Sequence, residues 1–188
     1  MTKYILHGGA IGNKTQDNKK FFIEIAKSLS KNANILCVYF SKDKNQWPEL
    51  FEQDKNNFSS ASPQKVFNFI LADDKKFILT NQIKEAEAIY FLGGNTDNIK
   101  AIIGNVENLK ELLNGKIVAG ESAGVNFLSK YFYSNRIENV SEGLGILPIK
   151  TFCHYTEEKS DKLERLKSHG EELKVYTIPE EKFFIINQ

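Results

Sequence analysis

The sequence has few of the features that mark membrane, nucleic-acid-binding or disulfide-stabilised proteins. Its 188 residues include only two cysteines, Cys37 and Cys153, which cannot form a disulfide framework, so we expect a reducing, cytoplasmic setting. The formal net charge is only +1, and this gives no reason to expect nucleic acid or an anionic membrane as a partner. No apolar run reaches the about 18 residues of a membrane span. We interpret residues 1–6 as a first strand rather than a signal peptide.

The remaining composition is ordinary for a soluble globular protein. The hydrophobic set makes up 41% of the chain and charged residues 26%, close to the averages for such proteins. No internal repeat, low-complexity tract or linker interrupts the sequence. A chain of this length suits one sizeable core. We therefore predict a single α/β domain over residues 1–188.

Hydrophobic periodicity predicts strands that alternate with helices. Continuous apolar runs typical of buried parallel strands alternate with segments whose apolar residues recur at helical spacing. The expected strands are residues 4–7, 34–40, 66–71, 86–92 and 116–120, and the expected helices are 18–31, 47–58, 73–85 and 97–113. This alternation predicts a three-layer, doubly wound, mainly parallel sheet with right-handed crossovers.

The last third of the chain is less regular. Residues 131–147 have no clean period, so we expect irregular structure or short strands there. A strand at 149–153 and a charged helix at 156–168 follow. Two late strands, 173–178 and 182–186, flank Pro179-Glu180-Glu181, which predicts a C-terminal hairpin.

A Gly-x-Ser-x-Gly sequence follows the fifth predicted strand. Gly120-Glu121-Ser122-Ala123-Gly124 has the pattern of a nucleophile elbow, in which glycines allow a sharp turn from strand to helix and expose the serine hydroxyl. The backbone amide of Ala123 would then lie at a helix N-terminus and could stabilise an oxyanion. The simpler alternative is a tight turn with a small residue in it.

Two further glycine turns are expected at the same edge of the sheet. Ligands of doubly wound sheets bind beyond the carboxyl ends of the strands, and His7-Gly8-Gly9 and Gly93-Gly94-Asn95 both follow predicted strands. The amide of Gly94 is a candidate second oxyanion donor. Asn95 could contact substrate or tie the turns together, or it could be an ordinary turn residue.

Ser122 needs a base, and three histidines are available. His154 ends a predicted strand after the serine, and we favour it on position and order. His7 is the alternative, because it closes the first strand. His169 is better explained by the end of a charged helix.

A third group should orient the histidine. Between Ser122 and His154 the carboxylates are Glu138 and Glu142, and we choose Glu138 because an acid stabilises the imidazolium that forms. Asn135 and Asn139 are neutral alternatives. Glu157 is more simply an acid in the first turn of a helix.

The order and spacing of these motifs resemble those of a known family. Phe91-Leu92-Gly93-Gly94-Asn95-Thr96, then Gly120–Gly124, then a histidine about thirty residues after the serine, is similar to the dipeptidase E / cyanophycinase family of serine peptidases. The resemblance implies a flavodoxin-like sheet related to class I glutamine amidotransferases. It also implies a Ser122/His154 pair, an oxyanion hole of the Gly94 and Ala123 amides, and no metal or cofactor.

The resemblance implies short, acidic peptides as substrates, but the chain departs from the family pattern at one place. Dipeptidase E has an aspartate roughly fifteen residues after the serine, whereas this chain has Asn135-Arg136-Ile137-Glu138. Arg136 could pair with a substrate carboxylate instead. We therefore expect a serine peptidase with a small peptide substrate and no nucleic acid or membrane partner, and a homodimer is left open.

Three other interpretations are weighed against this one. A carboxylesterase of the α/β-hydrolase fold can have the same elbow sequence, but too little chain follows Ser122 for its later strands and histidine. A homologue that binds a small ligand or peptide without catalysis is the second. A cysteine enzyme that uses Cys153 is the most remote, because adjacent strand residues Cys153 and His154 should point to opposite faces.

Overall fold

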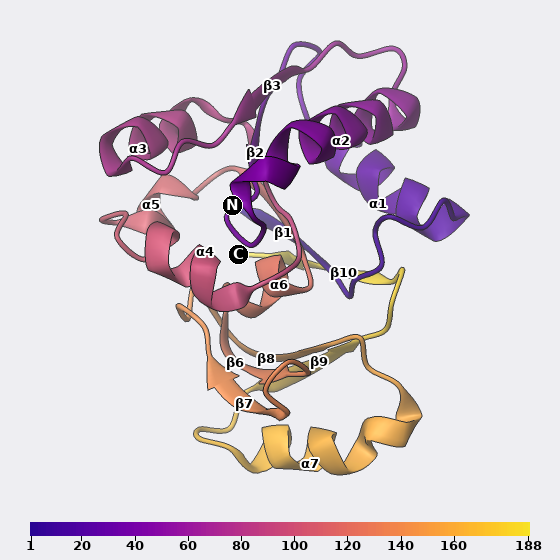
Figure 1. The fold of residues 1–188 in the computed structure, drawn as a ribbon, viewed down its shortest axis with the longest axis vertical. Coiled ribbons are helices and arrows are strands. Elements are labelled where there is room, and N and C mark those ends of the chain that lie inside the picture. The colour runs from indigo at the N-terminus through magenta and orange to yellow at the C-terminus, as the bar shows by residue number, and fades with distance from the viewer.

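Two β-sheets form the framework of the protein. The computed structural model describes all 188 residues, and Figure 1 shows the larger sheet above the smaller one. The larger sheet has six strands in the order β10-β1-β5-β4-β2-β3, and the smaller has four in the order β7-β6-β8-β9. The strands are β1 (Lys3–His7), β2 (Asn34–Val38), β3 (Asn68–Leu71), β4 (Ala88–Phe91), β5 (Ile117–Glu121), β6 (Ser129–Ser134), β7 (Asn139–Glu142), β8 (Leu147–Cys153), β9 (Lys174–Ile178) and β10 (Phe183–Asn187).

Helices cover both faces of the larger sheet. Its first five strands are parallel, and β10 is antiparallel to β1. The helices are α1 (Gln16–Lys27), α2 (Trp47–Ala61), α3 (Lys76–Glu85), α4 (Thr96–Ile103), α5 (Leu109–Leu112), α6 (Ala123–Asn126) and α7 (Ser160–Ser168), with short 3-10 turns at Lys44–Gln46 and Glu157–Lys159. The predicted α/β, doubly wound, mainly parallel architecture is confirmed.

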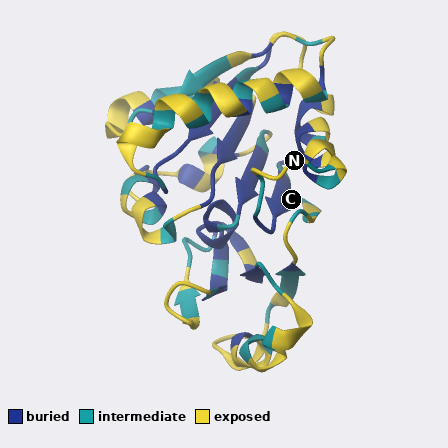
Figure 2. Ribbon diagram, turned by 45° about the vertical axis from the view of Figure 1, so that its right-hand side comes forward, coloured by how far each residue is buried: buried dark blue, intermediate teal, exposed yellow.

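The alternation of side chains along each strand divides the interior into two cores. In β2, Ile35 and Cys37 pack with α1 and α2, whereas Leu36 and Val38 pack with α3 to α6 on the opposite face. This follows from the two-residue period of a strand, and it explains why the strand is apolar throughout. Figure 2 shows the buried strands enclosed by helices whose outer faces are exposed. No helix has both the length and the apolar character that crossing a membrane requires.

The predicted C-terminal hairpin is wrong. β9 pairs in parallel with β8 of the smaller sheet, and β10 pairs antiparallel with β1 of the larger one. Two apolar segments joined by a short turn are compatible with a hairpin, but here each strand finds its partner in a different sheet. The connection at residues 179–182 therefore carries the chain from one sheet to the other.

The smaller sheet attaches to the larger one through β8. Leu147, Ile149 and Cys153 enter the core on the α3-to-α6 side. The opposite face of the sheet, with Phe152, packs against Leu166 of α7. The segment 131–147, for which irregular structure or short strands were expected, supplies most of β6 and all of β7. This arrangement brings the end of β8, where His154 lies, to the end of β5, where Ser122 lies.

Candidate active site

Ser122 lies in a sharp turn between β5 and α6. Its backbone has φ 46° and ψ −102°, a conformation that residues with side chains adopt only when the surroundings enforce it. The flanking glycines are needed for close approach. A Cβ on Gly120 would lie 2.5 Å from the carbonyl oxygen of Gly124, and one on Gly124 would lie 2.2 Å from that of Phe91. The chain thus turns sharply from strand to helix at Ser122, and the turn requires glycine on both sides.

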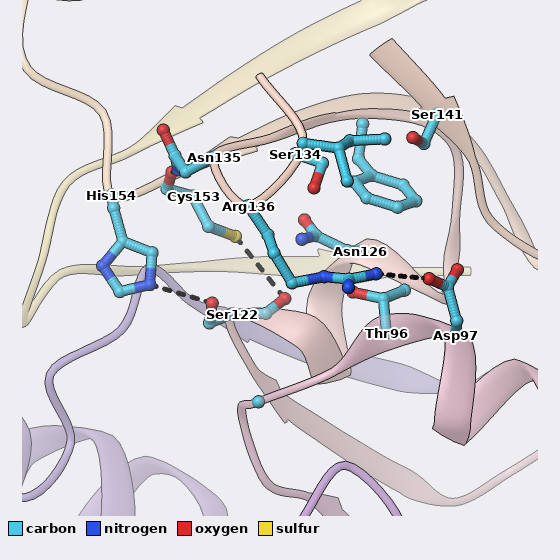
Figure 3. A pocket seen from close by; sticks show the side chains of 13 residues that line it. Thr96, Asp97, Ser122, Asn126, Ser134, Asn135, Arg136, Ser141, Cys153 and His154 are labelled. Carbon is cyan, nitrogen blue, oxygen red and sulfur yellow. Dashed lines mark hydrogen bonds and ion pairs between the residues drawn. The ribbon is translucent and has the colours of Figure 1, made fainter. Parts of the chain in front are cut away.

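His154 lies within hydrogen-bonding distance of the serine. The Oγ of Ser122 and the Nε2 of His154 are 2.9 Å apart, as Figure 3 shows. The histidine directly follows β8 and has a positive φ of 56°. Its backbone N–H donates to the carbonyl of Gly8 at 3.0 Å. A Cβ on Gly9 would lie 2.1 Å from the imidazole Cε1, so Gly9 makes room for the ring.

The carboxylate behind His154 is Glu180, which the sequence analysis missed. The Nδ1 of His154 lies 2.8 Å from Glu180 Oε1, so a proton on Nδ1 would be donated to that carboxylate and Nε2 would accept from the serine hydroxyl. Glu180 belongs to the connection between β9 and β10. The expected role of Glu138 is wrong, because its exposed carboxylate faces Lys162 at 3.4 Å and not His154. The alternative Asn135 donates to the carbonyl of Cys153.

The other two histidines are engaged elsewhere. His7 is fully buried; its Nδ1 accepts from the Gly9 amide at 3.2 Å, and its Nε2 lies 3.0 Å from Asn18 Oδ1. Burial lowers the pKa of His7 to about 4, so the ring is neutral and both nitrogens are occupied. His169 is the C-terminal cap of α7. Neither is placed to serve Ser122 as His154 is.

The glycine turn after β4 is held in place by two side chains. The hydroxyl oxygen of buried Ser41 lies 2.9 Å from the carbonyl oxygens of both Leu92 and Gly93, so its single proton is donated to one or shared between them. Buried Glu121 accepts from the Gly93 amide through Oε2 at 2.8 Å and from the Ile11 amide through Oε1 at 3.3 Å. The amide of Gly94 itself donates no hydrogen bond within the chain and is available as an oxyanion donor.

Two expected details of this region differ in the structure. The helix after Ser122 has only four residues, Ala123–Asn126, so the helix dipole adds little and Ala123 would contribute its amide N–H alone. Asn95 caps α4, with its side-chain oxygen accepting from the Asp97 amide at 3.0 Å. It does not line the cavity next to Ser122.

A small cavity of about 210 Å³ opens beside the serine. It is lined by Gly94, Thr96, Asp97, Ser122, Asn126, Phe132, Ser134, Asn135, Arg136, Ile137, Ser141, Cys153 and His154. Arg136 lies there as expected, but its guanidinium is paired with Asp97 at 2.6 Å. Burial raises the pKa of the Cys153 thiol far above its usual value, so Cys153 stays protonated and is unsuited to be the nucleophile.

A serine at a strand-to-helix elbow, next to a histidine on an α/β sheet edge, defines the class of serine hydrolases. The model of peptidase family S51 matches residues 4–188. The chain belongs to peptidase family S51, the dipeptidase E family, and is a serine-type peptidase. The resemblance derived from the two glycine motifs is thereby confirmed.

Two solved structures share the fold. A peptidase from an acI-B1 Actinobacterium has a TM-score of 0.67 and 19% identity, covering 99% of this chain and 83% of its own. A protein assigned as a peptidase E from Listeria monocytogenes EGD-e has a TM-score of 0.61 and 18% identity, covering 95% of this chain and 90% of its own. No curated protein matches the chain in sequence.

Glu180 could have been found from the strand pattern. It follows the apolar strand 173–178 and therefore lies at a carboxyl strand end, like the three glycine turns. It lies after His154 in the chain, outside the segment between Ser122 and His154 in which the acid is expected. The hydrogen bonds from the Gly93 and Ile11 amides to Glu121 could not be predicted, because the sequence shows only that a charged residue precedes Ser122 in the Gly-x-Ser-x-Gly motif.

Proposed function

We propose that the protein hydrolyses short peptides through Ser122, His154 and Glu180. The Oγ of Ser122 attacks the carbonyl carbon of the scissile bond while Nε2 of His154 takes the hydroxyl proton. Glu180 stabilises the imidazolium that forms. The amides of Gly94 and Ala123 donate to the oxyanion of the tetrahedral intermediate.

The rest of the cycle restores the enzyme. When the C–N bond breaks, His154 gives its proton to the departing amine, and the acyl group remains as an ester on Ser122. A water molecule then loses a proton to His154 and attacks the ester carbonyl. The acid product leaves when Ser122 Oγ regains that proton, so one water is consumed for each peptide bond.

The proposal rests above all on one continuous chain of contacts. Ser122 Oγ, the two nitrogens of His154 and Glu180 Oε1 follow one another at 2.9 Å and 2.8 Å. These spacings lie within hydrogen-bond reach, which is the geometric requirement for a general base and its orienting group.

The size of the cavity favours short peptides as substrates. Its volume of about 210 Å³ is below the range of about 300–1,000 Å³ that is typical of pockets for drug-sized ligands. The family resemblance also favours acidic residues, for which Arg136 would be the partner. Because Arg136 is already paired with Asp97, we propose that this pair weakens binding of a substrate carboxylate, which would have to displace Asp97.

The nucleophile is tested by labelling with a fluorophosphonate probe alongside hydrolysis of a dipeptide panel. We expect the wild type to be labelled and to cleave dipeptides, and the variants S122A and H154A to lose at least about 10⁴-fold in kcat/KM. Ser168→Ala is the matched control, because Ser168 is exposed at the end of α7. A wild type inert to the probe and to every dipeptide would contradict the proposal.

We also propose a cytoplasmic location. Cys37 and Cys153 are both free and buried, which suits a compartment that keeps thiols reduced. Fractionation of cells that express the chain would test this, and recovery outside the cytoplasm would contradict it.

A further inference from the structure

The cavity beside Ser122 contains a buried amide oxygen that has no hydrogen-bond partner in the protein. Asn126 is 8% exposed, and its side-chain oxygen has no hydrogen-bond partner. Buried polar atoms are paired in native proteins, and an unpaired one costs about 1–3 kcal/mol. Asn126 lines the cavity, and Figure 3 shows its amide among the side chains that face this space. The missing partner is therefore expected to come from a ligand.

The position of Asn126 ties it to the reacting serine. It is the last residue of α6, and its backbone N–H donates to the carbonyl of Ser122 at 2.9 Å. Ser122 and Asn126 both line the same cavity. Asn126 is thus placed to meet the substrate residue whose carbonyl is attacked, and it does not need to reach a distant part of the peptide.

The side chains that the cavity offers to a substrate are mostly neutral, and its charged pair, Arg136 and Asp97, is internally neutralised. Besides Asn126, the hydroxyl-bearing side chains Thr96, Ser134 and Ser141 line it. The one arginine, Arg136, is neutralised by Asp97 at 2.6 Å, and both side chains are more than half exposed. A substrate carboxylate would have to displace Asp97, and it has no proton to donate to the unpaired Asn126 oxygen.

We propose that this cavity is the subsite for the residue on the acyl side of the scissile bond, and that Asn126 makes it selective for a side-chain amide, as in asparagine or glutamine. A primary amide both donates and accepts, so it satisfies the Asn126 amide in either orientation. The inference rests on the proposed peptidase function and names its substrate class.

The test compares Asn-Leu, Asp-Leu and Ala-Leu, which differ only in the first side chain. We expect kcat/KM for Asn-Leu to exceed that for the other two by about tenfold, the value of one hydrogen bond. Asn126→Leu should lower kcat/KM for Asn-Leu, through KM, by about tenfold more than it lowers kcat/KM for Ala-Leu. Protection of Ser122 from the fluorophosphonate by each dipeptide gives a second readout that does not require turnover.

Because Asn126→Leu changes a buried residue and could disturb folding, a second variant tests the charge argument at the exposed residue Asp97. Asp97→Asn frees Arg136 and should raise kcat/KM for Asp-Leu about tenfold without a gain for Asn-Leu. The inference is overturned if wild type prefers Asp-Leu or Ala-Leu, or if Asn126→Leu lowers all three substrates equally. If no dipeptide is cleaved and Ser122 is not labelled, the proposed function fails and the inference fails with it.

Discussion

The serine and the histidine of the site are held in two different ways. Ser122 is positioned mainly by its own turn, in which Gly120 and Gly124 allow the close backbone approach, and its amide donates to the carbonyl of His7 at 2.9 Å. His154 is positioned by distant segments: Gly8 and Gly9 in the turn after β1, and Glu180 in the connection between the two sheets. The comparison teaches that the position of the proposed nucleophile is encoded mainly by a short motif, whereas the position of the proposed base depends on how distant segments pack.

Outside Ser122 and His154 themselves, the largest effect is expected where the two regions meet. Gly9 has φ +124°, and a Cβ there would lie 2.1 Å from the His154 ring, so Gly9→Ala must displace the imidazole. A misplacement of about 1 Å can cost about 100-fold, and we expect such a fall in kcat/KM. Gly12→Ala is the matched control in the same loop, since nothing lies within 4 Å of its added Cβ. Equal activities of the two variants would show that His154 is not held through Gly9.

A smaller effect is expected on the serine side. In Glu121→Gln the new NH₂ would face an amide donor, from Gly93 or Ile11, so one of the two hydrogen bonds is lost. The turn that carries Gly94 then loosens, and kcat should fall about tenfold with KM nearly unchanged, because the oxyanion exists only after attack.

The control for this variant is Glu172→Gln, an exposed glutamate before β9. It should match wild type in steady-state kinetics. A rise in KM at constant kcat in Glu121→Gln would instead place Glu121 in substrate binding.

The smallest effect on activity is expected far from the site, between α2 and the larger sheet. Burial raises the pKa of Asp54 to about 7 although Tyr39 donates to it at 2.8 Å. The folded pKa exceeds the unfolded value of 3.8, so this group stabilises the fold below pH 4, and that stabilisation is lost as the pH rises through about 7. Its upper limit is about 4 kcal/mol.

His7 acts in the opposite direction. Its folded pKa of about 4 lies below the unfolded 6.5, so its contribution is present above pH 6.5 and lost as the pH falls towards 4, with an upper limit of about 3 kcal/mol. In wild type the contributions of Asp54 and His7 to the free energy of unfolding change in opposite directions with pH. We expect Asp54→Asn to retain activity and to show a free energy of unfolding that rises from pH 4 to 6.5 in urea titrations. A pH profile identical to that of wild type would contradict the assignment.

Most of the larger sheet could be predicted from the sequence, because its signals are local. Apolar runs such as 34–40 and helical spacing such as 18–31 depend on burial of one segment at a time. The partners of the last two strands, β9 and β10, could not be predicted. The pairing of β9 with β8 and of β10 with β1 is a choice among distant partners, and the local pattern at Pro179–Glu181 fits a hairpin equally well.

The same distinction applies to the site. Ser122, His154 and the Gly94 turn follow from motifs at strand ends, and the structure brings them together. Glu138 was chosen by its place between serine and histidine in the chain, whereas Glu180 reaches His154 only because the chain crosses between sheets just beyond β9. The position of a residue in the chain therefore does not predict the partner of His154, which depends on the strand topology.

The central claim is that Glu180 supports His154, and a pair of glutamine variants tests it most directly. Glu180→Gln keeps the length of the side chain and can still orient the ring, but it removes the charge that stabilises the imidazolium. Glu138→Gln is the matched control, because its carboxylate faces Lys162 instead.

The measurement is the second-order rate constant for fluorophosphonate labelling of Ser122 in both variants, followed by kcat/KM on a cleaved dipeptide. Glu180 is 58% exposed, so we predict a fall of about 100-fold, less than for a buried triad acid. Glu138→Gln should stay within about twofold of wild type. Equal rates for the two variants, or a larger loss in Glu138→Gln, would contradict the account.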